Sequence, residues 1–340
     1  MPVAGFFYAL RNHMTTTTAQ SRPRTDIALR RYEDVRDMLP GVDNPSPLVR
    51  LRQDGRASVY LKLEWLNPFG SVKDRTAVFL LDGLIERGAL GGRELVEASS
   101  GNTAIALAAL ASLQGTRLTA TIPDGVPQEK KTILRMLGAE VWETPDDLCP
   151  VDSPKDGAIA LARALAASEG GTRFAATRQY ENEDNLKAHY ETTGPEIWAQ
   201  TDGAVTWFVA ALGTTGTVVG AGRYLKERNT AIKVVGVEPE PGHRLPGMKS
   251  FAEASVPTIY DPAVVDHSVV VSDDEAYATT KDIWRREALT VGPSTGAVIA
   301  ALDHLPIGPD DLVVAISADS GLKYTSYFEE ILGEEGTPQL

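Results

Sequence analysis

The chain has 340 residues, of which 43% are hydrophobic and 23% are charged, an ordinary globular mixture. This length predicts about two domains, each with enough chain to bury a core. The formal net charge of −13 argues against a general nucleic-acid binder, because such proteins normally present a basic face.

The start of the chain has the pattern of a leader rather than of a targeting or membrane segment. A short apolar piece precedes a Thr-rich polar stretch, without the charged segment that opens a signal peptide. No uninterrupted apolar run reaches the roughly 18 residues that a membrane span needs. The single cysteine, Cys149, excludes an intrachain disulfide framework, so we expect a cytoplasmic protein with no membrane partner.

Segments with the pattern of strands alternate with segments with the pattern of helices. The strand-like segments lie at 58–64, 94–99, 118–123, 140–145, 206–212, 233–239 and 312–317. Other segments repeat apolar residues at i, i+3 and i+4, as amphipathic helices do; they lie at 74–88, 103–115, 129–138, 158–171, 217–229 and 295–305. This order predicts an α/β fold in which mostly parallel sheets are covered by helices. Strand-like segments continue on both sides of residues 150–180, so we expect two α/β lobes with a crossing point there.

Four strand-to-helix loops are unusually rich in Gly, Ser and Thr. They are "NPFGSVKDR" (67–75), "SSGNTA" (99–104), "GTTGT" (213–217) and "GPSTGA" (292–297). In α/β folds, ligands collect at the carboxyl ends of the strands, where such loops lie. The four loops are therefore the candidate binding site.

The loop at 213–217 has the composition of an anion site at a helix N-terminus. Its small residues allow close backbone approach, and Thr214, Thr215 and Thr217 add hydroxyl groups. A phosphate monoester would suit this loop. The alternative is a tight turn whose threonines cap the helix.

The loops at 99–104 and 292–297 offer polar groups of other kinds. Asn102 can donate and accept at a fixed point, and the hydroxyls of Ser99, Ser100 and Thr103 can hold a carboxylate. Ser294 is a neutral partner for a heteroaromatic nitrogen. Helix capping is the alternative reading for both loops, and for the second loop taken alone it is the favoured one.

Lys73 completes a set of four groups that suits one cofactor. A lysine that faces a phosphate site can form a Schiff base with an aldehyde. Pyridoxal phosphate is both an aldehyde and a phosphate ester, and it needs partners for its ring hydroxyl and its ring nitrogen. Helix capping alone does not explain why four such loops occur in one chain.

On these residues, the chain resembles the cysteine synthase and cystathionine β-synthase family of fold-type II pyridoxal-phosphate enzymes. The resemblance runs from about Asn44 to Phe328. "NPFGSVKDR" resembles the family's P-x-G-S-x-K-D-R motif, and "GTTGT" resembles G-T-G-G-T. "QYENEDNLKAHYETTGPEIW" (179–198) matches a further family stretch almost position by position.

The resemblance implies a role for each candidate residue. Lys73 would be the catalytic residue, bound to the cofactor aldehyde. The other cofactor-binding residues would be Asn102, Gly213, Thr214, Thr215, Gly216, Thr217 and Ser294. The substrate-binding residues would be Ser99, Ser100, Thr103, Gln179 and Lys249.

The sequence departs from the family pattern at three of these loop positions. Ser99 stands where the family has Thr, and Ala104 and Thr215 stand where it has Gly. A β-branched residue disfavours positive φ. We therefore expect Thr215 to avoid that region unless it is strained, and to add a hydroxyl near the phosphate.

The resemblance also implies how the domains are divided. Residues 67–178 would form the smaller N-terminal lobe, and 41–66 plus 179–330 the larger lobe that binds the cofactor phosphate. Residues 1–40 would be a partly disordered leader, and 331–340 a tail. A homodimer is expected by analogy of fold.

The implied reaction is β-replacement through an aminoacrylate. It would form L-cysteine, or a close analogue, from an activated serine and a sulfur donor. O-acetylserine is the leading donor, and O-phosphoserine stays open because Lys249 lies in a cationic segment, 238–251. The alternatives are serine or threonine β-elimination, cystathionine β-synthase activity and, with least support, a non-catalytic binding protein.

Overall fold

The computed structural model describes residues 31–52, 57–145 and 157–328. Residues 1–30 of the predicted leader, the predicted tail at 331–340 and Cys149 lie outside these ranges. Met38–Leu340 form one unit, to which both sheets and the candidate site belong. Among the helices of the described ranges, none is both long enough and apolar enough to cross a membrane.

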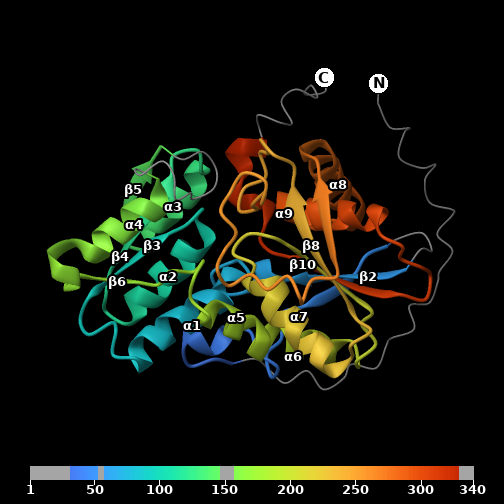
Figure 1. The fold of residues 1–340 in the computed structure, drawn as a ribbon, viewed down its shortest axis with the longest axis horizontal. Coiled ribbons are helices and arrows are strands. Elements are labelled where there is room, and N and C mark those ends of the chain that lie inside the picture. Colours follow the sequence, from blue (N-terminus) through green and yellow to red (C-terminus); the bar gives the residue numbers. More distant parts are fainter. Residues whose placement is uncertain (1–30, 53–56, 146–156, 329–340) are drawn as a thin grey trace, which may run out of the picture. The chain divides into compact units, whose positions relative to one another are not determined.

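The smaller sheet has four parallel strands (Figure 1). Their order is β5 (Glu140–Thr144), β4 (Leu118–Pro123), β3 (Glu94–Ala98) and β6 (Phe174–Ala176). Every residue of β4 is buried, as expected for a parallel strand with helices on both faces. The covering helices are α2 (Asn102–Leu113), α3 (Gln128–Met136) and α4 (Ala158–Ala167).

The larger sheet has six strands, of which only β1 runs antiparallel to its neighbour. Their order is β1 (Leu48–Arg50), β2 (Ser58–Leu63), β10 (Leu312–Ser317), β7 (Trp207–Ala211), β8 (Lys233–Pro239) and β9 (His267–Val271). Successive side chains of a strand point to opposite faces. Val209 accordingly packs with α9, and its neighbour Phe208 packs in the separate core that contains α7.

The helices lie on both faces of this sheet (Figure 1). One face carries α8 (Asp273–Glu287) and α9 (Pro293–Ala300). The other carries α5 (Asp184–Ala188), α6 (Gly194–Gln200) and α7 (Gly216–Arg228). The predicted α/β class, with two mostly parallel sheets covered by helices, is confirmed; the predicted lobe boundaries stay a prediction.

Helix α1 (Lys73–Glu86) follows β2 of the larger sheet and packs on α2 of the smaller one. The chain returns through α5, which also lies against α1. The start of α1 therefore stands where the two sheets meet, and the residues that fix this start position the cavity.

A buried ion cluster fixes the first turn of α1. Arg75 is 1% exposed and donates to both carboxylates of the cluster, at 2.7 Å from Nε to Glu64 Oε2 and 2.5 Å from Nη1 to Glu196 Oε1. Lys62 lies 2.7 Å from Glu196, so two cations balance two anions. Burial alone would raise the pKa of Glu64, but the charge of Arg75 lowers it to about 2.

Removing Arg75 should therefore cost far more stability than removing an exposed arginine near the same helix. Arg75→Leu leaves two buried carboxylates with Lys62 as their one remaining cation, and we expect a loss of about 3–5 kcal/mol. Arg87, half exposed and paired with Asp184 just after α1, provides the control. Arg87→Leu should cost less than about 1 kcal/mol in urea unfolding; equal losses for the two variants would contradict the role of the cluster.

Candidate active site

A cavity opens at the carboxyl ends of the strands of both sheets. Its floor includes Ala211 at the end of β7, Asp319 just after β10 and Ser100 just after β3. Most of the predicted site residues line it: Lys73, Ser100, Asn102, Thr103, Gln179, Gly213, Thr214, Thr217, Lys249 and Ser294. Ser99, Thr215 and Gly216 belong to the same loops but do not line the cavity.

Lys73 is the first residue of α1, and its backbone is held from the neighbouring loop. The Ser71 hydroxyl accepts the Lys73 amide at 3.2 Å, and Ser71 forms a β-bridge with Asp319. Gly70, at φ 83, turns the chain before this bridge. Desolvation lowers the pKa of Lys73 to about 8, and the charge of Asp319 opposes this effect. At pH 7 roughly a tenth of the Lys73 side chains are then uncharged.

Asp319 is a buried carboxylate in the lining that the sequence patterns did not predict. It is 2% exposed, and its Oδ2 accepts from Asn102 Nδ2 at 2.7 Å and from the Tyr324 hydroxyl. Lys130 donates to that hydroxyl at 2.8 Å and lies 3.9 Å from Asp319. The other oxygen, Oδ1, has no hydrogen-bond partner among the described residues. An acidic residue two positions after a buried strand is the signal that would have identified it.

Asn102 begins α2 and faces the cavity with both ends of its amide engaged. Its Nδ2 donates to Asp319, and its Oδ1 accepts from Lys323 Nζ at 3.2 Å. Gly101 precedes it at φ 119, where an added Cβ would lie 2.6 Å from the Lys130 side chain. The position of the Asn102 amide thus depends on Asp319 and Lys323, after the larger sheet's β10, and on Lys130 of α3.

The loop at 213–217 leads into the N-terminus of α7. Asn185 Nδ2 donates to Thr214 Oγ1 at 2.9 Å, and His189 Nε2 lies 3.2 Å from Thr217 Oγ1. Burial and the nearby charge of Lys73 lower the pKa of His189 well below its usual value, so the ring is neutral. The neutral His189 ring therefore adds no positive charge beside the loop at 213–217.

Thr215 was expected to avoid positive φ unless its backbone is strained. It adopts the left-handed conformation, at φ 71, so its backbone is strained. It caps α7, and its hydroxyl is buried with no hydrogen-bond partner among the described residues. The loop needs a left-handed residue before the helix begins, and this need prevails over the preference of a β-branched side chain.

The groups in the cavity fit pyridoxal phosphate. An added Cβ on Gly213 would lie 2.6 Å from the carbonyl oxygen of Gly247, so at this point the loop can present only backbone. The first amides of α7 have no intrahelical acceptor and suit an anion. An amine from Lys73 and a neutral hydroxyl from Ser294 line the same cavity.

The predicted substrate-binding residues lie on the small-sheet side of the cavity, except Lys249. Thr103 Oγ1 donates to Gln179 Oε1 at 2.6 Å, and Gln179 Nε2 donates to Ala98 O at 2.7 Å. Ser99 Oγ accepts the amides of Gly101 and Ala104, so it braces the loop rather than facing the cavity.

Lys249 follows β8 of the larger sheet and lines the same cavity. It is 4% exposed, and its Nζ lies 4.9 Å from the centre of the Tyr180 ring. His243 and Arg244, the other cations of its segment, do not line the cavity. Arg244 stacks on Tyr327 instead, at 5.3 Å.

The charge of Asp319 should set the reactivity of Lys73. In Asp319→Asn the opposing charge is gone, so the pKa of Lys73 should fall further below 8, by about one unit or more. The pH dependence of reductive methylation at Lys73 in the apoprotein, followed by peptide mass spectrometry, measures this. Asp311→Asn, just before the other end of β10, is the control. An unchanged profile in Asp319→Asn would show that the two groups are not coupled.

Comparison with known proteins identifies the family. Residues 41–319 match the family described as pyridoxal-phosphate dependent enzyme. Cysteine synthase B of Escherichia coli is 39% identical over 295 residues, which cover 85% of this chain and 94% of that protein. Cysteine synthase B of Pseudomonas aeruginosa is 40% identical over 286 residues, covering 83% of this chain and 93% of that protein.

Solved structures agree with the sequence comparison. A cysteine synthase from Entamoeba histolytica has a TM-score of 0.79 and 29% identity, over 92% of this chain and 95% of that one. An O-ureido-L-serine synthase has a TM-score of 0.80 and 31% identity, over 91% of this chain and 98% of that one. The chain therefore belongs to the family of pyridoxal-phosphate dependent enzymes, and it is a cysteine synthase-like member of it.

Proposed function

We propose that this enzyme forms L-cysteine, or a close analogue, by β-replacement on an activated serine with a sulfur nucleophile. One observation carries the proposal: an amine of lowered pKa, a phosphate-type loop and a neutral serine line a single cavity. The curated relatives named cysteine synthase support the same reaction.

The bound cofactor would supply an electron sink for the substrate carbanion. Lys73 would hold its aldehyde and move the α-proton, a task suited to an amine whose pKa lies near the working pH. The loop at 213–217 would hold the phosphate, and Asn102 would contact the ring oxygen.

Ser294 would face the ring nitrogen at the start of α9. A neutral hydroxyl leaves that nitrogen unprotonated and weakens the electron sink, which disfavours transamination. Loss of a β-substituent followed by addition of a nucleophile needs less electron withdrawal. The residue types thus favour β-replacement over reactions that need a protonated ring.

The donor is proposed to be O-acetylserine. Among the described residues that line the cavity, the cations are Lys73 and Lys249. A phosphate ester would place about two negative charges at the entrance, with Lys249 alone to meet them, since Arg244 is stacked away from the cavity. An acetyl ester is uncharged and needs no such partner. The protein is further proposed to act as a homodimer.

Lys73→Ala should abolish turnover without unfolding the protein. The substitution removes the amine and leaves the Arg75 cluster in place, so we expect at least about a thousandfold loss of kcat and an unchanged urea midpoint. Visible absorbance of the bound cofactor should be lost or shifted as well. Turnover near the wild-type rate in this variant would remove the role assigned to Lys73.

A donor panel tests the proposed reaction. The holoenzyme should use O-acetylserine with kcat/KM at least about tenfold above that for O-phosphoserine, with sulfide as nucleophile. Lys249→Met should change the O-acetylserine value little. A large, Lys249-dependent preference for O-phosphoserine would reverse the donor assignment. Pyruvate release that sulfide does not affect would instead indicate a β-eliminase.

A further inference from the structure

Glu97 is a buried carboxylate in β3, beside the loop proposed to hold the substrate carboxylate. It is 2% exposed, and the Thr177 hydroxyl donates to its Oε2. The backbone amides of Arg178 and Gln179 and the Gln179 side chain also act on this carboxylate, and each lowers its pKa. The reaction described above assigns no role to Glu97.

The turn at 177–179 needs these bonds to keep its shape. Arg178 has φ 55, a left-handed conformation that a residue other than glycine adopts only when its surroundings impose it. The Glu97 carboxylate accepts from Thr177, directly before that strained position, and Gln179, directly after it, donates to the carbonyl of Ala98, the next residue of β3. The carboxylate therefore holds the turn in a conformation that the chain would not keep unaided.

This turn connects the two loops that meet in the cavity. The Gln179 side chain bonds to Thr103 at the start of α2. The Gln179 carbonyl accepts from Asn185 Nδ2 at 2.8 Å, and the same nitrogen donates to Thr214 of the phosphate-type loop. A shift of the turn would move Gln179 and Thr103 away from the substrate and leave Lys73 in place.

We propose that Glu97 is a positioning residue, whose ionised carboxylate fixes the 177–179 turn and thereby aims Gln179 and Thr103 at the α-carboxylate of the substrate. The inference rests on the proposed function, because only that function assigns the α-carboxylate of the substrate to the Gln179 and Thr103 side of the cavity. An ionised carboxylate is an acceptor only and matches the donors around it. A protonated one would turn an O–H towards those donors.

Burial raises the pKa of Glu97 to about 7, and the hydrogen bonds of the turn oppose this rise. Four other titratable groups line a cavity of about 30 Å³ beside Glu97: Arg163 of α4, Arg178 of the turn, and Tyr180 and Glu181 just after the turn. On the neighbouring strand β4, the residue opposite Glu97 is Ala120, which carries no charge. The turn is thus fully held above pH 7 and loosened below it, so the KM of the amino-acid substrate should rise as the pH falls through 7.

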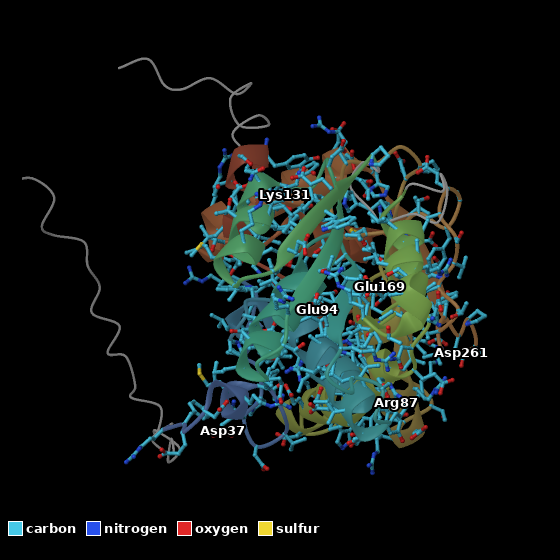
Figure 2. The ribbon with its side chains drawn as sticks, turned by 90° about the vertical axis from the view of Figure 1, so that its left-hand side faces the viewer. Asp37, Arg87, Glu94, Lys131, Glu169 and Asp261 are labelled. Atoms are coloured by element: carbon cyan, nitrogen blue, oxygen red, sulfur yellow. The ribbon has the colours of Figure 1, made fainter. Side chains whose placement is uncertain are left out.

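Glu97→Gln in the holoenzyme tests this role. At pH 8 we expect KM for O-acetylserine to rise at least tenfold, with kcat within threefold of wild type. The rise in KM that the wild type shows below pH 7 should be absent. Glu94→Gln is the control, because Glu94, labelled in Figure 2, begins the same strand. Its side chain is 19% exposed and pairs with Arg117. A KM within twofold of wild type, or an equal loss in kcat, would overturn the proposal.

Two further measurements keep the test decisive. If Glu97→Gln does not fold, Thr177→Val takes its place, because it removes only the hydroxyl that donates to Glu97. We expect this variant to raise KM twofold to fivefold, and an unchanged KM would overturn the proposal. The dissociation constant of L-alanine, read from cofactor absorbance, should rise tenfold in Glu97→Gln. L-Alanine has the α-carboxylate but no leaving group, so this measurement stands even if the wild type does not use O-acetylserine.

Discussion

The pairing of Arg75 with Glu64 and Glu196 is the constraint on which the rest of the structure depends. These charges come from α1, from the turn after β2 and from α6, so one guanidinium joins three parts of the chain. Buried charges are tolerated only when they are paired, which leaves a single arrangement for the first turn of α1. Lys73 lies two residues before Arg75, so the reactive amine is placed by an interaction that takes no part in the chemistry.

The two sides of the cavity are held together by polar contacts rather than by apolar packing. Asn102, which follows β3 of the smaller sheet, bonds to Asp319, which follows β10 of the larger one, and Lys130 of α3 bonds to Tyr324 in the same way. Each sheet has its own apolar core beneath this joint. Groups that must meet a cofactor precisely are thereby supported by rigid strands and helices, and they meet one another through directional bonds.

Local patterns were enough to predict most of the sheet framework. The seven predicted strands correspond to β2, β3, β4, β5, β7, β8 and β10, with ends within one residue of those predicted. The strands β1 and β6 have three residues each, too short for any periodicity to identify. Helix α8 was missed although Ser272 and Glu275 form a capping box at its start, a signal that the sequence carries.

The candidate site was predictable where it depends on loop composition and not where it depends on distant contacts. Gly, Ser and Thr at strand ends led to the four loops, and each loop contributes at least one polar residue to the cavity. Lys130 meets Tyr324 across 194 positions of sequence, and no local pattern reveals such a contact. Ser99 shows the opposite case, since its hydroxyl braces its own loop, as the capping alternative implies.

The order of strands in the larger sheet has a consequence for how the protein is made. Strand β2 pairs with β1, its near neighbour in sequence, and with β10, which the ribosome delivers some 250 residues later. All four strands of the smaller sheet are synthesised in that interval, so the smaller lobe can close while one edge of β2 stays unpaired. We expect one edge of β2 to need shielding in the nascent chain until β10 emerges, which makes the larger sheet the part most dependent on chaperones.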